Sequence, residues 1–161
     1  MQVSFTIPGR VKGKGRPRAS IMEKRDGTRF VNVYTDAQTL SGESLVRKIA
    51  KAEMGEWPPF TGPIKLTIAI FQQIPVSWSK KEKASAVYIT TGFDLDNQVK
   101  LLCDGMNNIV WRDDKQVAEL HVTRLYDDSA GDHVDITIEE LSVAVRKETV
   151  ARLPLFSEAS A

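Results

Sequence analysis

The clearest pattern in the chain is an alternation of large apolar residues with smaller or polar ones. Residues 63–74 place Leu66, Ile68 and Ile70 at every second position, which predicts a strand with both faces largely buried. Residues 2–7, 29–34, 116–125 and 133–139 show the composition or alternation of further strands. The last two segments are expected to pair with each other through the turn-rich residues 127–132.

Helical spacing predicts three further elements. Apolar residues near i, i+4 spacing predict a helix over residues 35–54, which Gly55 and Pro58-Pro59 end. A short exposed helix is expected over residues 79–87 and another over residues 97–106. The elements together predict one α+β domain over residues 1–140, with a mixed β-sheet and packed helices. Residues 141–161 have weak periodicity and are expected to form a C-terminal extension, either helical or disordered.

Composition narrows the class of protein. The 161 residues are 42% hydrophobic and contain no long apolar run, so no membrane-spanning segment is expected. The first ten residues lack the pattern of a signal peptide. The single cysteine, Cys103, has no intramolecular disulfide partner, and the simplest expectation is a cytoplasmic protein.

Positive charge is concentrated near the N-terminus. The whole chain has a formal net charge of +1, yet residues 10–29 contain eight basic and two acidic residues. Five of the basic residues occupy alternate positions: Arg10, Lys12, Lys14, Arg16 and Arg18. The glycines and the proline between them favour a mobile loop over a rigid strand. This basic segment predicts a polyanionic partner.

Negative charge is concentrated in residues 93–117, which contain five aspartates: Asp94, Asp96, Asp104, Asp113 and Asp114. In an extended chain Asp94 and Asp96 would point to the same side, where their charges repel unless a cation lies between them. Hard carboxylate oxygens suit Mg²⁺, which also accepts phosphate oxygens as ligands. Of the neighbours Asp113 and Asp114, only one is expected to reach the metal, because adjacent residues of an extended chain face opposite ways.

The predicted helix over residues 97–106 extends this polar group. Asp96, Lys100 and Asp104 share one helical face, and Val99, Leu102, Cys103 and Met106 form the neighbouring apolar stripe. Lys100 therefore lies one turn beyond Asp96, where it could pair with a carboxylate or contact a phosphate. Hydrolysis of a phosphodiester by metal-activated water is a reaction that would use these carboxylates and this lysine together. Neither His121 nor His133 belongs to a recognisable triad, and no nucleotide-binding loop is present.

Three motifs in order carry a family resemblance: GKGRPRA (residues 13–19), DLDNQVKLLCDGMNN (94–108) and WRDDKQVAELHV (111–122). With them the chain resembles the RusA family of Holliday-junction resolvases over about residues 1–140. The resemblance implies a homodimeric, Mg²⁺-dependent nuclease that nicks four-way DNA junctions symmetrically on two strands. It also implies that Asp94, Asp96 and Asp114 are the catalytic, metal-binding carboxylates and that Lys100 is functional.

The remaining expectations concern partners and alternatives. Lys12, Lys14, Arg16 and Arg18 are expected to bind DNA, with Asp104 and Asp113 as auxiliary residues. Mg²⁺ is the expected cofactor, Mn²⁺ a candidate substitute, and no nucleotide cofactor is expected. Because no base-reading module is visible, recognition is expected to depend on DNA shape and deformability. Two alternatives stay open: a non-catalytic module that binds branched DNA, and a metal nuclease for another structured nucleic acid.

Overall fold

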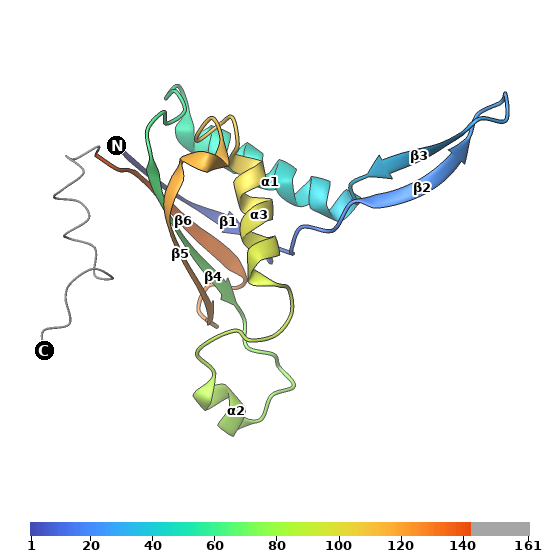
Figure 1. Ribbon diagram of the computed structural model, residues 1–161. Helices are drawn as coiled ribbons and strands as arrows, with labels where there is room; N and C mark the ends of the chain where they lie inside the picture. Colours follow the sequence, from blue (N-terminus) through green and yellow to red (C-terminus); the bar gives the residue numbers. More distant parts are fainter. Residues whose placement is uncertain (143–161) are drawn as a thin grey trace, which may run out of the picture.

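The computed structural model describes residues 1–142, and its main feature is a four-stranded sheet in the order β1-β6-β4-β5. The strands are β1 (Gln2–Pro8), β4 (Ile64–Gln72), β5 (Val117–Tyr126) and β6 (His133–Glu140). Two helices, α1 (Ala37–Met54) and α3 (Leu95–Met106), pack together beside this sheet (Figure 1). The expected α+β architecture with a mixed sheet is confirmed.

The strand pairing differs from the expected hairpin. β5 pairs in parallel with β4, and β6 pairs antiparallel with both β4 and β1. β5 and β6 therefore flank β4 on opposite sides, and the prediction that they pair with each other is wrong. Local alternation identified both strands correctly. The partner was decided by β4, whose alternate residues are fully buried and which forms the centre of the sheet.

One face of the sheet forms the hydrophobic core. Each strand of the β1-β6-β4 group alternates buried residues with more exposed ones, and helices α1 and α3 contribute their apolar stripes. The opposite face is polar: Ser4 and Thr137 share a hydrogen bond of 3.0 Å, and Thr6 donates to Asp135 at 2.6 Å. The helices thus cover a single face of the sheet, as amphipathic strands require.

Close contact between α1 and α3 depends on two glycines. A Cβ atom at Gly105 of α3 would lie 2.6 Å from the Cβ of Val46 in α1, which real side chains do not tolerate. In the other direction, Gly42 of α1 faces the Leu101 side chain of α3, at 3.1 Å from its hypothetical Cβ. The missing side chains let the two helices approach, and this contact sets the place of α3 on the sheet.

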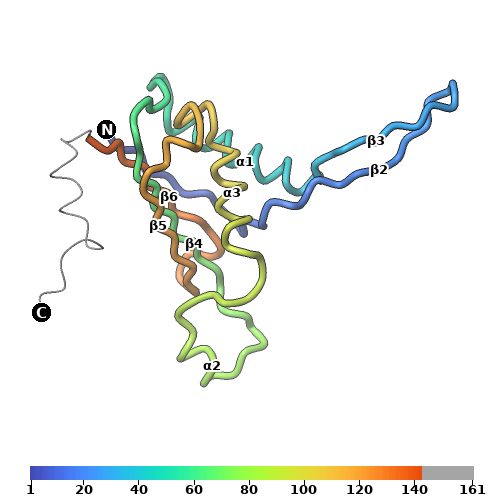
Figure 2. The backbone as a smooth tube through the Cα atoms, viewed as in Figure 1, coloured from blue at the N-terminus to red at the C-terminus, as the bar shows by residue number. Residues whose placement is uncertain are grey.

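A two-stranded ribbon projects from this body. It consists of β2 (Arg18–Glu23) and β3 (Arg29–Tyr34), which pair antiparallel with each other and not with the main sheet. Figure 2 shows the ribbon extending away from α1 as a separate arm. The strand over 29–34 was expected, whereas β2 was not, because the basic residues before it suggested a loop.

The connection from β4 to α3 carries α2 (Lys80–Ser85), close to the helix expected over residues 79–87. Ser79 and Glu82 form a reciprocal capping box at its start. The chain then runs along the end of β5, where Ile89 N–H donates to Arg124 O (3.1 Å) and Tyr126 N–H to Val87 O (3.0 Å). This brings residues 91–94 beside β5 before α3 begins.

Among residues 1–142, no helix is long and apolar enough to cross a bilayer. The predicted extension over residues 141–161 lies outside the described residues from position 143 onward.

Candidate active site

Helix α3 begins earlier than its sequence suggested. It spans Leu95–Met106 with Asp94 as its N-cap, two residues before the expected start at Asn97. Asp96 therefore lies in the first helical turn and not in extended chain. The extended chain that was expected to bring both carboxylates to one side therefore ends at Asp94, whose own backbone is extended, and Asp96 is helical.

Both carboxylates at this helix start remain available. Asp94 and Asp96 are exposed, and the Asp94 side chain accepts no capping hydrogen bond from the helix backbone. Within residues 1–142, the Asp94 side chain accepts one hydrogen bond, a long one of 3.4 Å from Asn97 Nδ2. An N-cap aspartate normally binds the N–H of the second or third helical residue. Asp94 thus leaves its carboxylate oxygens free for another ligand.

Asp113 and Asp114 have different local roles. Asp113 is the N-cap of a short 3-10 helix, η1 (Asp114–Gln116), and its side chain accepts from Lys115 N–H at 3.0 Å. That backbone hydrogen bond lowers the pKa of Asp113 below its usual value. The Gln116 side chain fixes the same turn by donating to Phe60 O and Gly62 O, each at 2.9 Å. Asp114 has no capping role, which favours it over Asp113 for chemistry.

The buried thiol of Cys103 shows which part of α3 lies near Asp114. Burial is the main cause that raises the pKa of Cys103 to about 12, followed by the negative charges of Asp114 and Asp104. The charge of Asp114 therefore acts on the second half of α3. Lys100, which is exposed, lies one turn from Asp96 and one turn from Cys103. Along α3, Lys100 therefore lies between Asp96 and Cys103.

The three predicted metal ligands do not form one group in the single chain. Among residues 1–142, no three side chains of Asp, Glu, His or Cys are arranged to hold a metal ion. Helical rise places Cys103, whose pKa is raised in part by the charge of Asp114, roughly 13 Å along the axis from Asp94. Two exposed carboxylates at the helix start still suit Mg²⁺ by their chemistry, because this ion often takes only one or two carboxylates besides water and phosphate.

Asp104 takes part in a different cluster. The Lys14 ammonium bonds to Asp104 of α3 and lies 3.0 Å from Glu43 Oε1 of α1. All three side chains are at most a quarter exposed. Burial alone would lower the pKa of Lys14, but the hydrogen bonds and charges of Asp104 and Glu43 outweigh it and raise the pKa. Lys14 was expected to bind DNA, and here it links α1 to α3.

The basic segment around Lys14 is held along its length. Gln98, fully buried, donates to Val11 O at 2.7 Å, and Lys14 N–H donates to Asn97 O at 2.9 Å. Gly15 N–H donates to Thr39 Oγ1 at 2.9 Å. The expected loop, in place of a strand, is confirmed for residues 10–17, but these hydrogen bonds anchor residues 11–15 to α1 and α3. Gln98, Thr39 and Glu43 were missed, because their partners are 24 or more residues away and no local pattern marks such contacts.

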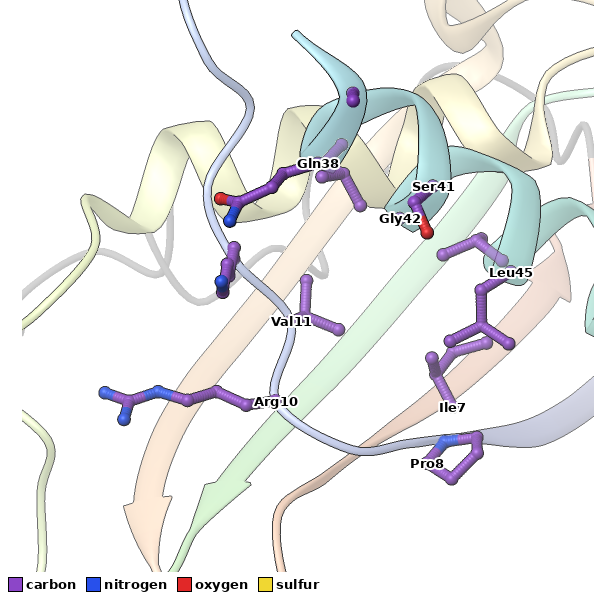
Figure 3. Close-up of a pocket in the computed structure, with 12 residues that line it drawn as sticks. Ile7, Pro8, Arg10, Val11, Gln38, Ser41, Gly42 and Leu45 are labelled. Atoms are coloured by element: carbon purple, nitrogen blue, oxygen red, sulfur yellow. The ribbon is translucent and has the colours of Figure 1, made fainter.

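This anchoring creates a pocket of about 360 Å³ next to the start of α3. Its lining joins the basic segment, the start of α1 and the turn before α3, and includes Lys12, Arg18, Phe93, Asp94 and Asn97. A neighbouring pocket of about 380 Å³ lies between the basic segment and α1 (Figure 3). Ile7, Val11 and Leu45 make that second pocket largely apolar. Of these two pockets, the first combines a carboxylate of the DLD motif with basic side chains.

Similarity to known proteins indicates the family of this chain. Residues 8–139 match the family described as "Endodeoxyribonuclease RusA". The chain belongs to the RusA endodeoxyribonuclease family. The RusA match spans the basic segment, α3 and the Asp113–Asp114 turn, and so contains every candidate site residue. The chain is also 32% identical over 146 residues to a Bacillus subtilis (strain 168) protein named "Uncharacterized protein YqaN", covering 87% of this chain and 97% of that protein.

Proposed function

We propose that this RusA-family protein is a Mg²⁺-dependent endonuclease that resolves four-way DNA junctions by paired symmetric nicks. The supporting observation is the pocket in which Asp94 faces the same space as Lys12 and Arg18. A carboxylate beside basic groups suits a metal ion and a phosphodiester together, because each neutralises part of the charge of the other.

Asp94 and Asp96 would hold the ion, with Mn²⁺ as a substitute for Mg²⁺. When bound, the ion would neutralise the scissile phosphate and lower the pKa of a water. Asp114 is proposed as a further ligand, which requires the η1 turn and the start of α3 to approach each other when DNA binds. Lys100, on the face between these carboxylates, would stabilise negative charge that develops on the phosphate.

The basic residues would position the DNA backbone. Lys12, Arg16 and Arg18 are exposed on or next to the anchored segment and would contact phosphates. Lys14 would reach DNA only by leaving Glu43 and Asp104, so its main role is to fix the segment. Since phosphate contacts carry no sequence information, selection of a branched substrate would depend on DNA shape.

A homodimer is part of this proposal. A four-way junction has near two-fold symmetry and needs two cuts, and a C₂ dimer presents two identical sites in a matching arrangement. Sedimentation of the protein with and without junction DNA would measure this state. A monomer that cuts both strands at once would contradict the dimer.

The first test is a digest of four-way junction, fork, flap and linear duplex DNA, with Mg²⁺ and with EDTA. The proposal expects paired nicks in the junction, little cutting of linear duplex, and no cutting in EDTA. Equal cutting of linear duplex would contradict the proposed specificity for junctions. Undiminished cutting in EDTA would contradict the proposed requirement for a metal ion.

The second test compares matched aspartate variants. Asp96→Asn and Asp114→Asn should each lower the cleavage rate at least about 100-fold while junction binding persists, because each variant lacks a negative charge that would hold the metal ion. Asp113→Asn is the control, since asparagine is an equally good N-cap and should preserve the turn. If Asp113→Asn were the inactive variant, the assignment of Asp114 would be wrong.

A further inference from the structure

Two arginines from distant parts of the chain meet at the turn that precedes Asp94. Arg10 belongs to the basic segment and Arg124 to β5. A hypothetical Cβ atom at Gly92 would lie 3.5 Å from Nη2 of Arg10 and 4.0 Å from Nη2 of Arg124. The two guanidinium nitrogens are therefore separated by no more than the sum of these two distances.

Each arginine is held in place from one side. Arg124 Nη2 donates to Thr91 O at 2.9 Å, and the Arg10 guanidinium lies 6.0 Å from the centroid of the Phe93 ring. In Figure 3 the Arg10 side chain extends away from the apolar residues Ile7 and Leu45. Both charged groups are thus directed toward the turn and not into the core.

Neither charge is balanced by the described part of the chain. Within residues 1–142, no carboxylate lies within ion-pair distance of Arg10 or Arg124. Arg124 Nε is also buried without a hydrogen-bond partner. Two neighbouring guanidinium groups repel each other, and a buried donor without a partner costs free energy. An anion between them would remove both penalties.

Gly92 keeps the space between the two groups open. Its φ of +90° is a conformation that other residues rarely adopt, and any side chain there would enter the gap between the guanidinium groups. An anionic oxygen that accepts from both Nη2 atoms needs N–O distances of about 2.8 Å, and two oxygens of one phosphate could span a wider gap.

We propose that Arg10 and Arg124 form a phosphodiester-binding subsite at Gly92, which holds a DNA phosphate next to the one at Asp94. This inference rests on the proposed function, because it places the substrate backbone across the turn that leads into the catalytic helix. Phosphate is favoured over a carboxylate ligand because two planar guanidinium groups match its several oxygens.

The test is a coupling experiment between protein and DNA. Junction affinity is measured in EDTA for the wild type, Arg10→Gln and Arg124→Gln, on junctions in which single phosphates are replaced by neutral methylphosphonates. Each variant should bind intact junction about tenfold more weakly, and its log affinity should depend less steeply on log salt, by about one unit. At one phosphate position, the methylphosphonate should weaken binding of the wild type but not of either variant, because the variants already lack the contact to that phosphate.

Arg47→Gln, on the exposed surface of α1, is the charge-matched control and should leave the effect of that phosphate unchanged. Two controls separate loss of the phosphate contact from loss of the hydrogen bond to Thr91 O. Arg124→Lys keeps the positive charge without the guanidinium, and thermal melting measures whether a variant destabilises the fold. If the wild type binds and cuts junctions but no phosphate couples to either arginine, the subsite is overturned and the nuclease proposal stands. If the wild type neither binds nor cuts branched DNA, both proposals fail.

Discussion

The N-terminal basic region contains two parts with opposite relations to the rest of the protein. Residues 10–17 have no regular secondary structure, yet they are tied to α1 and α3 by backbone and side-chain hydrogen bonds. Residues 18–34 form two regular strands, yet they project from the body with most side chains exposed. Regular hydrogen bonding within a segment and attachment of that segment to the fold are therefore independent properties.

The exposed apolar residues of the projecting arm sharpen this difference. Ile21, Val31 and Val33 are 76%, 63% and 64% exposed, and their hairpin pairs only with itself among the described strands. An isolated two-stranded hairpin is marginally stable in water. The irregular segment, by contrast, contributes Val11 to the core and Lys14 to a charged cluster. We expect substitutions of the anchored residues Val11, Lys14 and Gly15 to affect folding, and substitutions in the hairpin to affect DNA binding.

The largest effect is expected at Gly15. A Cβ atom there would lie 2.1 Å from Oδ2 of Asp36, whose Oδ1 caps α1 by accepting from Thr39 N–H. Gly15→Val should therefore reduce the free energy of unfolding by about 3 kcal/mol, through overpacking and loss of the cap. Chemical denaturation measures this, with Ile21→Thr in the hairpin as a control that should change stability by less than about 0.5 kcal/mol. Equal losses of stability in the two variants would contradict the proposed difference between the anchored segment and the hairpin.

The next effect is expected at Lys14. Lys14→Met leaves Glu43 and Asp104 without their cation, and a loss of about 2 kcal/mol is expected from a partly buried cluster. Because the folded-state pKa of Lys14 is raised above 10.5, its contribution is complete below about pH 10.5 and declines as pH rises through the folded-state pKa. Denaturation from pH 7 to 11.5 should show the difference between wild type and variant shrinking only at the alkaline end. A stability difference that stays constant up to pH 11.5 would contradict the role of Lys14 as the cation of this cluster.

A smaller effect, on binding and not on folding, is expected from the hairpin. Replacing residues 19–33 by two glycines removes Lys24, Arg25 and Arg29 without breaking a hydrogen bond of the main sheet. Junction affinity should fall about tenfold, equivalent to about 1.4 kcal/mol, and the salt dependence should become less steep. Far-ultraviolet circular dichroism would check that the body stays folded. Unfolding of the body would show that the hairpin is part of its core.

The smallest effect is expected at the ion pair within the hairpin. Arg29 and Glu23 lie 3.1 Å apart, but their side chains are 76% and 56% exposed. Glu23→Gln should change the free energy of unfolding by less than about 0.5 kcal/mol, since water and salt screen such pairs. Lys14→Met, measured alongside, provides the contrast between an exposed and a partly buried charge.

Much of the fold followed from local patterns. The alternation in β4 and the helical spacing in α1 predicted their bounds to within two residues, because core-facing residues repeat at the period of each element. The start of α3 was displaced because Asp94 and Asp96 are both good N-caps, and local propensity does not choose between them. The pairing of β5 with β4 was missed because parallel pairing joins segments that are far apart in the sequence.

The sequence by itself determined the types of element, the basic segment, the aspartate set and the family, because these depend on residue identity and short spacing. Only the tertiary structure decided which charges are available. Within residues 1–142 it assigned Lys14 to Glu43 and Asp104, left Asp94, Asp96 and Asp114 outside any three-residue metal-binding arrangement, and brought Arg10 beside Arg124. The physical reason is that an ion pair depends on distances of a few ångströms between residues that can be over a hundred positions apart, and no local pattern encodes those distances.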